Sequence, residues 1–184
     1  GLARSLSKFF LIKVFADHTD GFEEFDNSVS FSIERVSGFK LLRKYRKSNL
    51  INEYLKQNNN IQCLIADHWK SLELIQTNKK KICLIHSKEI NHPKGSRLNT
   101  KVLQVLNNVD HVIANSNFTK DLAINLGVEE HRILVINPGV DPVKEIPSKD
   151  LKKADEVFKG KKQRLITVSR YDKRKNHEKV IMAV

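Results

Sequence analysis

Residues 97–127 read RLNTKVLQVLNNVDHVIANSNFTKDLAINLG. Apolar side chains recur every three or four residues from Leu98 to Val109, which predicts a helix with one apolar face. The short apolar run His111–Ala114 follows at once and is typical of a buried strand. A second helical stripe leads from Phe118 to Leu126. Helix, strand and helix in direct succession predict a layered α/β fold.

The residues around the second stripe predict where that helix begins and ends. Ser116 or Asn115 is placed to accept hydrogen bonds from the first free amides of the helix. Gly127 stands where a left-handed residue ends many helices.

The same alternation extends over most of the chain. Most of the predicted strands are continuous apolar runs, as expected for parallel strands that are covered on both faces, and their connections should be right-handed crossovers. We therefore predict a Rossmann-like parallel sheet with helices on both faces. The strand at Val29–Val36 alternates with polar residues and suits an edge. The remaining predicted strands are Ile12–Ala16, Ile61–Ala66, Ile82–His86, Ile133–Ile136 and Leu165–Val168.

A change in composition predicts a domain boundary. Three of the four prolines and a lysine-rich stretch fall within residues 137–162. We therefore predict a first Rossmann-like domain at 1–140, a linker at 141–162 and the start of a second such domain at 163–184. The stretch from Leu2 to Phe10 predicts a first helix with no strand ahead of it, so we expect both domains to be truncated.

The chain is strongly basic, with 33 Lys and Arg against 21 Asp and Glu and a formal charge of +12. Basic residues cluster at 40–47, 79–81 and 149–164, which would suit nucleic acid, anionic lipid or phosphorylated small molecules. No run of aromatic residues alternates with basic ones as in a single-strand binding platform, which makes nucleic acid the less favoured partner. Cys63 and Cys83 lie within apolar runs, which favours buried thiols in a reducing, cytoplasmic compartment over a disulfide.

The loop at 169–176 follows a predicted strand and precedes a predicted helix, the position where α/β sheets bind ligands. Arg170 and Lys175 can converge on one anion if this loop folds back on itself. A merely solvated basic loop is the alternative.

Two other polar segments follow predicted strands. His86 could act as a hydrogen-bonding or acid/base group, or could simply cap its loop. Asp67-His68-Trp69 has the same placement after its strand.

The turn at 137–141 predicts a positive φ at Gly139. The sequence has no phosphate loop, dinucleotide fingerprint or zinc-ligand spacing, so we expect neither a metal nor a cofactor.

Several of these segments together resemble a known family. The order of four segments along the chain is unlikely to arise by chance. They are the stretch 112–119, Gly127-Val128, the stretch 132–141, and Val168-Ser169-Arg170 with Lys175. They resemble the middle of a retaining, nucleotide-sugar-dependent glycosyltransferase of family 4, which has the two-Rossmann-domain GT-B fold. The resemblance spans roughly residues 61–184 and is weak before residue 60.

The resemblance implies a hexosyltransferase-type enzyme of glycan biosynthesis. Its first domain would hold an unknown glycan or lipid-linked acceptor, and its second a nucleotide-sugar donor, as substrate rather than cofactor. Arg170 and Lys175 would bind the donor diphosphate, His86 would lie near the transferred sugar, and Gly1 would be a remnant of the glycine-rich donor loop. The basic blocks would suit peripheral contact with an anionic inner membrane surface.

Departures from the family pattern leave alternatives open. Ser169 and Asn176 stand where the family usually has glycine, although Asn tolerates the left-handed region. An acidic pair of the donor site is absent, so we expect this chain alone to lack transferase activity. The alternatives are a sugar-nucleotide epimerase or phosphorylase on the same frame, or a basic nucleic-acid-binding α/β module.

Overall fold

The computed structural model describes residues 1–140, 145–160 and 164–183. It divides the chain into two compact units, Gly1–Asp141 and Pro142–Val184, which are taken separately below. The predicted linker and second domain include the undescribed positions 141–144, 161–163 and 184. The predicted domain boundaries therefore stay a prediction.

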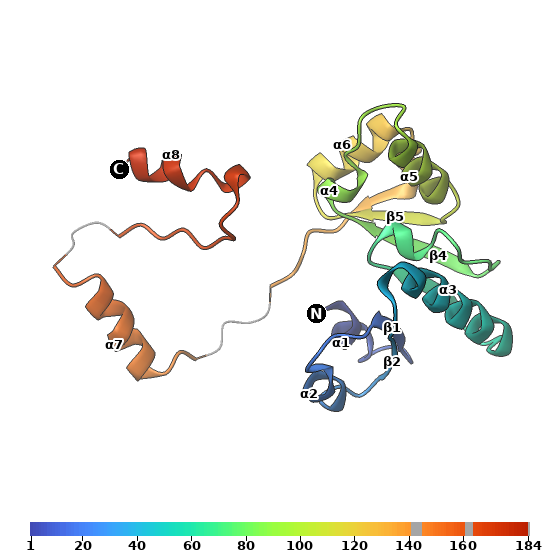
Figure 1. Ribbon diagram of the computed structural model, residues 1–184, viewed down its shortest axis with the longest axis horizontal. Helices are drawn as coiled ribbons and strands as arrows, with labels where there is room; N and C mark the ends of the chain where they lie inside the picture. The colour runs from blue at the N-terminus through green and yellow to red at the C-terminus, as the bar shows by residue number, and fades with distance from the viewer. Residues whose placement is uncertain (141–144, 161–163, 184) are drawn as a thin grey trace. The chain divides into compact units, whose positions relative to one another are not determined.

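The first unit is built on two parallel sheets (Figure 1). A two-stranded sheet pairs β1 (Lys13–Asp17) with β2 (Ser32–Val36). A four-stranded sheet has the order β3-β4-β5-β6. Its strands are β3 (Cys63–Ala66), β4 (Lys80–Ile85), β5 (His111–Ala114) and β6 (Ile133–Val135). Every pairing is parallel, which confirms the predicted α/β class.

Helices connect these strands, as the alternating pattern predicts. The long helix α3 (Lys40–Gln57) joins the two sheets, and α5 (Arg97–Asn107) and α6 (Asn117–Leu126) flank β5 in sequence. The shorter helices of this unit are α1 (Leu2–Leu6), α2 (Phe22–Asn27), α4 (Ser87–Ile90), and the 3₁₀ turns η1 (Trp69–Ser71) and η2 (Glu130–Arg132).

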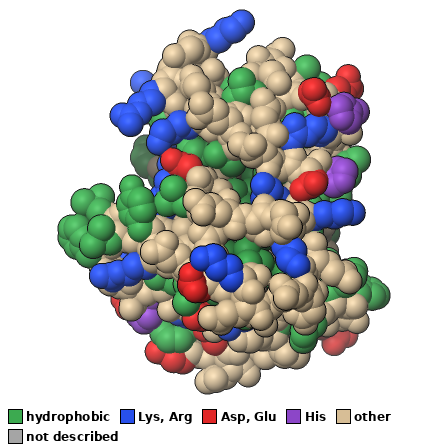
Figure 2. Space-filling view, turned by 90° about the vertical axis from the view of Figure 1, so that its right-hand side faces the viewer, with side chains coloured by type: hydrophobic (Ala, Val, Ile, Leu, Met, Phe, Trp, Pro, Cys, Tyr) green, Lys and Arg blue, Asp and Glu red, His purple; other side chains and the backbone are tan. Residues whose placement is uncertain are grey.

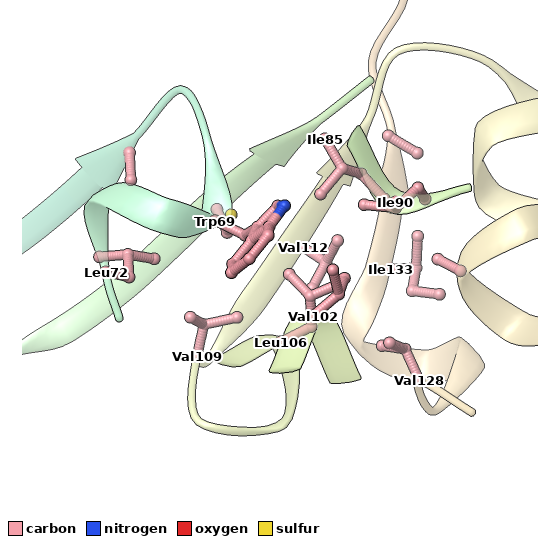
Figure 3. Packing of buried hydrophobic residues seen from close by; sticks show 14 residues of the cluster. Trp69, Leu72, Ile85, Ile90, Val102, Leu106, Val109, Val112, Val128 and Ile133 are labelled. Carbon is pink, nitrogen blue, oxygen red and sulfur yellow. The ribbon is translucent and has the colours of Figure 1, made fainter. Parts of the chain in front are cut away.

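The hydrophobic core lies between the four-stranded sheet and α5 and α6 (Figure 3). Ile85 and Val112 from the sheet are fully buried, and so are Val102 and Leu106 from α5. Trp69 enters the same cluster, where its indole Nε1 donates to the carbonyl of Glu89 at 3.0 Å. This bond satisfies the one polar atom of the indole inside the core.

The predicted ends of α6 are confirmed. The Ser116 hydroxyl accepts from the backbone N–H of Thr119 at 3.2 Å, and Gly127 ends the helix with φ +110°. Of the two candidate caps, Ser116 takes the role, which leaves the side chain of Asn115 for another partner.

The second unit contains α7 (Ser148–Val157), the turn η3 (Lys173–Lys175) and α8 (His177–Met182). The strand predicted at Leu165–Val168 is wrong: these residues have no regular structure, and Ile166 and Val168 are 79% and 87% exposed. A strand needs a neighbour for its N–H and C=O groups, and the described part of this unit contains no other strand.

Several boundaries and one turn also differ from the predictions. Strand β2 begins at Ser32 rather than Val29, and α1 ends at Leu6 rather than Phe10. Helix α3 begins at Lys40, so the basic block at 40–47 is helical. The positive φ predicted at Gly139 is wrong, because its φ lies outside the left-handed region.

Candidate functional site

The candidate site of the first unit lies at the carboxyl ends of β4 and β5. The strand register pairs Ile85 with Ala114, so the next residues, His86 and Asn115, follow two neighbouring strands at the same edge of the sheet. The Asn115 amide nitrogen and His86 Nδ1 are 3.4 Å apart. His86 is exposed, whereas Asn115 is half-buried. Parallel sheets bind ligands at this edge.

Local structure fixes the backbone of His86. His86 is the N-cap residue of α4, and the Glu89 carboxylate accepts a hydrogen bond from its backbone N–H. The His86 side chain in turn faces the backbone N–H of Glu89, so the two residues form a capping box. The capping role of His86 is therefore observed, whereas its role as a hydrogen-bonding or acid/base group stays a prediction; its ring is exposed.

A second histidine belongs to this edge. His68 follows β3, and its Nδ1 accepts from the backbone N–H of Lys70 at 3.0 Å. Burial lowers the pKa of His68 below its usual value; the carboxylate of Glu89 opposes this shift, and the charge of Lys70 adds to it. His68 is therefore mostly uncharged at pH 7.

Asn115 and Thr119 also belong to this site, although the sequence pattern did not predict them there. The Thr119 hydroxyl is buried and donates to the Asn115 carboxamide oxygen at 2.7 Å. The signal was available, because Asn115 follows β5 directly, as His86 follows β4. The sequence pattern instead placed Asn115 as a possible helix cap and within the stretch 112–119 that resembles the family.

The predicted anion-binding loop belongs to the second unit. Its backbone turns back on itself: His177 Nε2 lies 3.1 Å from the Ser169 hydroxyl and 3.2 Å from the carbonyl oxygen of Arg170. Asn176 has φ +52° and therefore adopts the left-handed conformation. Asn tolerates this conformation at a position where the family usually has glycine. Arg170 and Lys175 are both exposed. Their convergence on one anion stays a prediction.

Gly1, the predicted remnant of a donor loop, is the N-cap residue of α1. A Cβ added at Gly1 would meet no atom within 4 Å. No three His, Cys, Asp or Glu side chains in the described ranges gather in a group that could hold a metal ion. None of the helices described has both the length and the apolar character that crossing a bilayer requires.

Basic side chains do not form one stripe on the face of the molecule shown in Figure 2. Lys and Arg are spread over that face and mixed with acidic side chains. Such mixing differs from the continuous basic track that a nucleic-acid backbone requires.

Comparisons with known proteins agree with this fold. The model of Glycosyltransferase Family 4 matches residues 2–144. A crystal structure of Anabaena Alr3699/HepE in complex with UDP and glucose has a TM-score of 0.61 at 19% identity, over 86% of this chain and 45% of that chain. A structure of the same protein with UDP gives 0.57 at 15% identity, over 80% and 50%. This chain thus spans about half the length of these structures, and at such identities the likeness concerns the fold. No curated protein sequence matches significantly.

Proposed function

The chain belongs to glycosyltransferase family 4, and from that premise we propose that it forms the acceptor-side domain and the beginning of the donor side of a retaining glycosyltransferase. The enzyme transfers a hexose from a nucleotide-sugar donor to a glycan or lipid-linked acceptor. The nucleotide sugar is a substrate, and the reaction uses neither a cofactor nor a metal.

One observation carries the proposal for the first unit. His86 and Asn115 lie at the carboxyl ends of adjacent parallel strands, within a chain that matches the family over residues 2–144. In this role the exposed ring of His86 contacts the transferred sugar. Sugar hydroxyls both donate and accept hydrogen bonds, so a neutral imidazole suits them.

In the second unit, Arg170 and Lys175 act on the leaving group. Negative charge develops on the diphosphate as the glycosidic bond breaks, and fixed cations stabilise that charge. The folded-back loop supports this role, because His177 holds the carbonyl of Arg170 and so restrains the backbone that carries the guanidinium.

The test is sugar transfer by the longest natural polypeptide that contains this chain, with a panel of UDP- and GDP-sugars. Arg170→Ala should lower kcat/KM for the donor by about 100-fold or more. Arg164→Ala is the matched control, because Arg164 is exposed in the same unit and pairs with Asp155. Equal activities of the two variants would refute the diphosphate role.

Product analysis separates the alternatives. An epimerised nucleotide sugar would indicate an epimerase, and a sugar 1-phosphate would indicate a phosphorylase. A glycosylated acceptor with the anomeric configuration of the donor supports the proposal.

We further propose that the enzyme works in the cytoplasm, in peripheral contact with an anionic membrane. The support is the start of α3, where Phe39, Leu41 and Tyr45 are 66%, 74% and 56% exposed beside the exposed Lys40 and Arg46. Apolar and basic side chains on one short segment match the interfacial region of an anionic bilayer.

Co-sedimentation with phosphatidylglycerol and phosphatidylcholine vesicles tests this contact. Each basic residue near the surface contributes about 1 kcal/mol, so Lys40→Gln/Arg46→Gln should weaken binding to anionic vesicles by roughly 30-fold. Lys152→Gln/Lys153→Gln removes the same charge from α7 and is the control. Equal losses in both double variants, or equal binding to neutral vesicles, would contradict the proposed surface.

A further inference from the structure

A directed chain of hydrogen bonds leads from the start of α6 to the ring of His86. The backbone N–H of Thr119 donates to the Ser116 hydroxyl oxygen at 3.2 Å, and the two hydroxyl oxygens are 3.1 Å apart. The Thr119 hydroxyl and the Asn115 carboxamide oxygen are 2.7 Å apart. Asn115 then reaches His86 Nδ1 at 3.4 Å. We call these four residues the relay.

The shortest of these distances sets the direction of the bonds along the relay. A separation of 2.7 Å is typical of an O–H donor to an oxygen acceptor and short for an amide N–H, so the oxygen of the Asn115 carboxamide faces Thr119. The single hydroxyl proton of Thr119 is then used, and Ser116 supplies the proton between the two hydroxyls. The amino group of Asn115 therefore faces His86.

An amino group of a carboxamide can only donate, so the ring nitrogen it faces must offer a lone pair. The backbone N–H of Glu89, which the His86 side chain also faces, is likewise a donor. In a neutral imidazole, one nitrogen carries the proton and the other does not. With Nδ1 unprotonated, the proton lies on Nε2.

We propose that Asn115, oriented by Thr119, is a positioning residue that fixes His86 as the tautomer with its proton on Nε2. No side chain in the described part of the chain bonds to Nε2, so this N–H is free to meet a ligand. Given the proposed function, on which this inference rests, neutral His86 then acts toward the sugar as a hydrogen-bond donor and not as a base. The ligand atom it selects is an oxygen with a lone pair.

Nitrogen-15 NMR of the ligand-free chain tests the tautomer without any transferase assay. Histidine is labelled with ¹⁵N, and His86→Gln assigns the His86 signals among the seven histidines. The folded chain should show one protonated and one unprotonated ring nitrogen, with the proton on Nε2. The proportion of this tautomer should exceed that in the same chain unfolded in urea.

Two variants address the relay itself. Asn115→Asp replaces the donor by a carboxylate that only accepts, so the proton should move to Nδ1 and the two ring signals should exchange roles. Thr119→Val keeps the shape of the buried side chain but frees the carboxamide to turn, so the tautomer proportions should move towards those of the unfolded chain. Circular dichroism establishes that each variant is folded.

Thr100→Val is the matched control, because Thr100 lies in the first turn of α5 and its hydroxyl donates to the carbonyl of Ser96. It should leave the His86 signals unchanged. Protonation of Nδ1 in the native chain, or unchanged His86 signals in folded Asn115→Asp, would overturn the proposal. Because no donor or acceptor is added, neither result depends on whether the chain takes part in glycosyl transfer.

Discussion

Glu73 shows how a single carboxylate can join two helices. It follows η1 and forms ion pairs with Lys44 of α3 and with Lys101 of α5, the latter at 3.0 Å. Burial of Glu73 opposes its ionisation, but the hydrogen bonds and charges of the two lysines outweigh that effect and lower the pKa of its carboxyl group. The carboxylate therefore stabilises the fold in its ionised state.

A pH series checks the contribution of Glu73. A carboxyl group with a lowered pKa stabilises the protein above the pKa it has when unfolded, near 4.3, and this stabilisation is lost as the pH falls through its folded pKa. Glu73→Gln should thus reduce the free energy of unfolding by about 1 kcal/mol at pH 7 and by little at pH 3. Urea titrations give both values.

Glu53→Gln is the control, because Glu53 is 61% exposed and pairs with Lys56 three residues later. It should change stability very little at either pH. A pH-independent loss in Glu73→Gln would mean that the two lysines are not the cause.

Cys83 should be chemically inert in the folded chain. Burial raises the pKa of its thiol to about 12, and the carboxylates of Glu89 and Asp67 act in the same direction. Because only the thiolate reacts with iodoacetamide, Cys83 should stay unmodified at pH 8 until the protein unfolds. Mass spectrometry of peptides from native and guanidinium-treated protein measures this.

Cys63 provides an internal comparison. It is half-buried, and burial raises the pKa of its thiol too, so it should react slowly but before Cys83. Both are free thiols, but only Cys83 is buried, as was predicted for both. Rapid alkylation of Cys83 in the native chain would show that the core opens there.

At the scale of elements, the C-terminus of α6 requires a glycine. Gly127 has φ +110°, and its N–H closes the helix by bonding to the carbonyls of Ala123 and Ile124. An alanine there meets the penalty of a left-handed residue, so Gly127→Ala should cost about 1–2 kcal/mol of unfolding free energy. Thermal and urea unfolding measure the loss.

Gly139→Ala is the matched control. Gly139 does not have a left-handed φ, and a Cβ added there would meet no atom within 4 Å. This substitution should leave stability within a few tenths of a kcal/mol of the original chain. A similar loss in both variants would show that backbone geometry is not what Gly127 supplies.

The ends of α6 also show how much of the fold could be predicted. Apolar periodicity and cap residues are local properties, so they located α5, α6 and β5 closely. The same rules failed at Leu165–Val168, because a β-strand is defined by a partner that local sequence does not contain. They also left the start of α3 unrecognised, since its first two turns mix basic residues with Leu41, Leu42 and Tyr45, which are exposed and do not face the core.

The candidate site, like the fold, could be predicted from the sequence only in part. His86 was predicted from its position after a strand, and that position is confirmed. Its contact with Asn115 could not be predicted, because the register that sets Ile85 beside Ala114 is a tertiary property. The choice between Asn115 and Ser116 as the cap decided which side chain was left to face the histidine.

At the scale of the whole molecule, burial is concentrated in the first unit. Every buried residue in the described ranges lies before residue 134, and neither α7 nor α8 contains one. Since burial of apolar surface dominates folding free energy, the first unit should hold nearly all of the cooperative stability of this chain.

A truncation tests whether that stability is self-contained. The chain Gly1–Val140 should unfold with the same midpoint in urea as residues 1–184, and with a free energy within about 0.5 kcal/mol. A chain that ends at Glu129 instead removes β6, whose Ile133 is 5% exposed and pairs with Val112, and should fail to unfold cooperatively. If the first truncation also lost cooperativity, the core would depend on residues of the second unit, and the independence inferred from burial would be wrong.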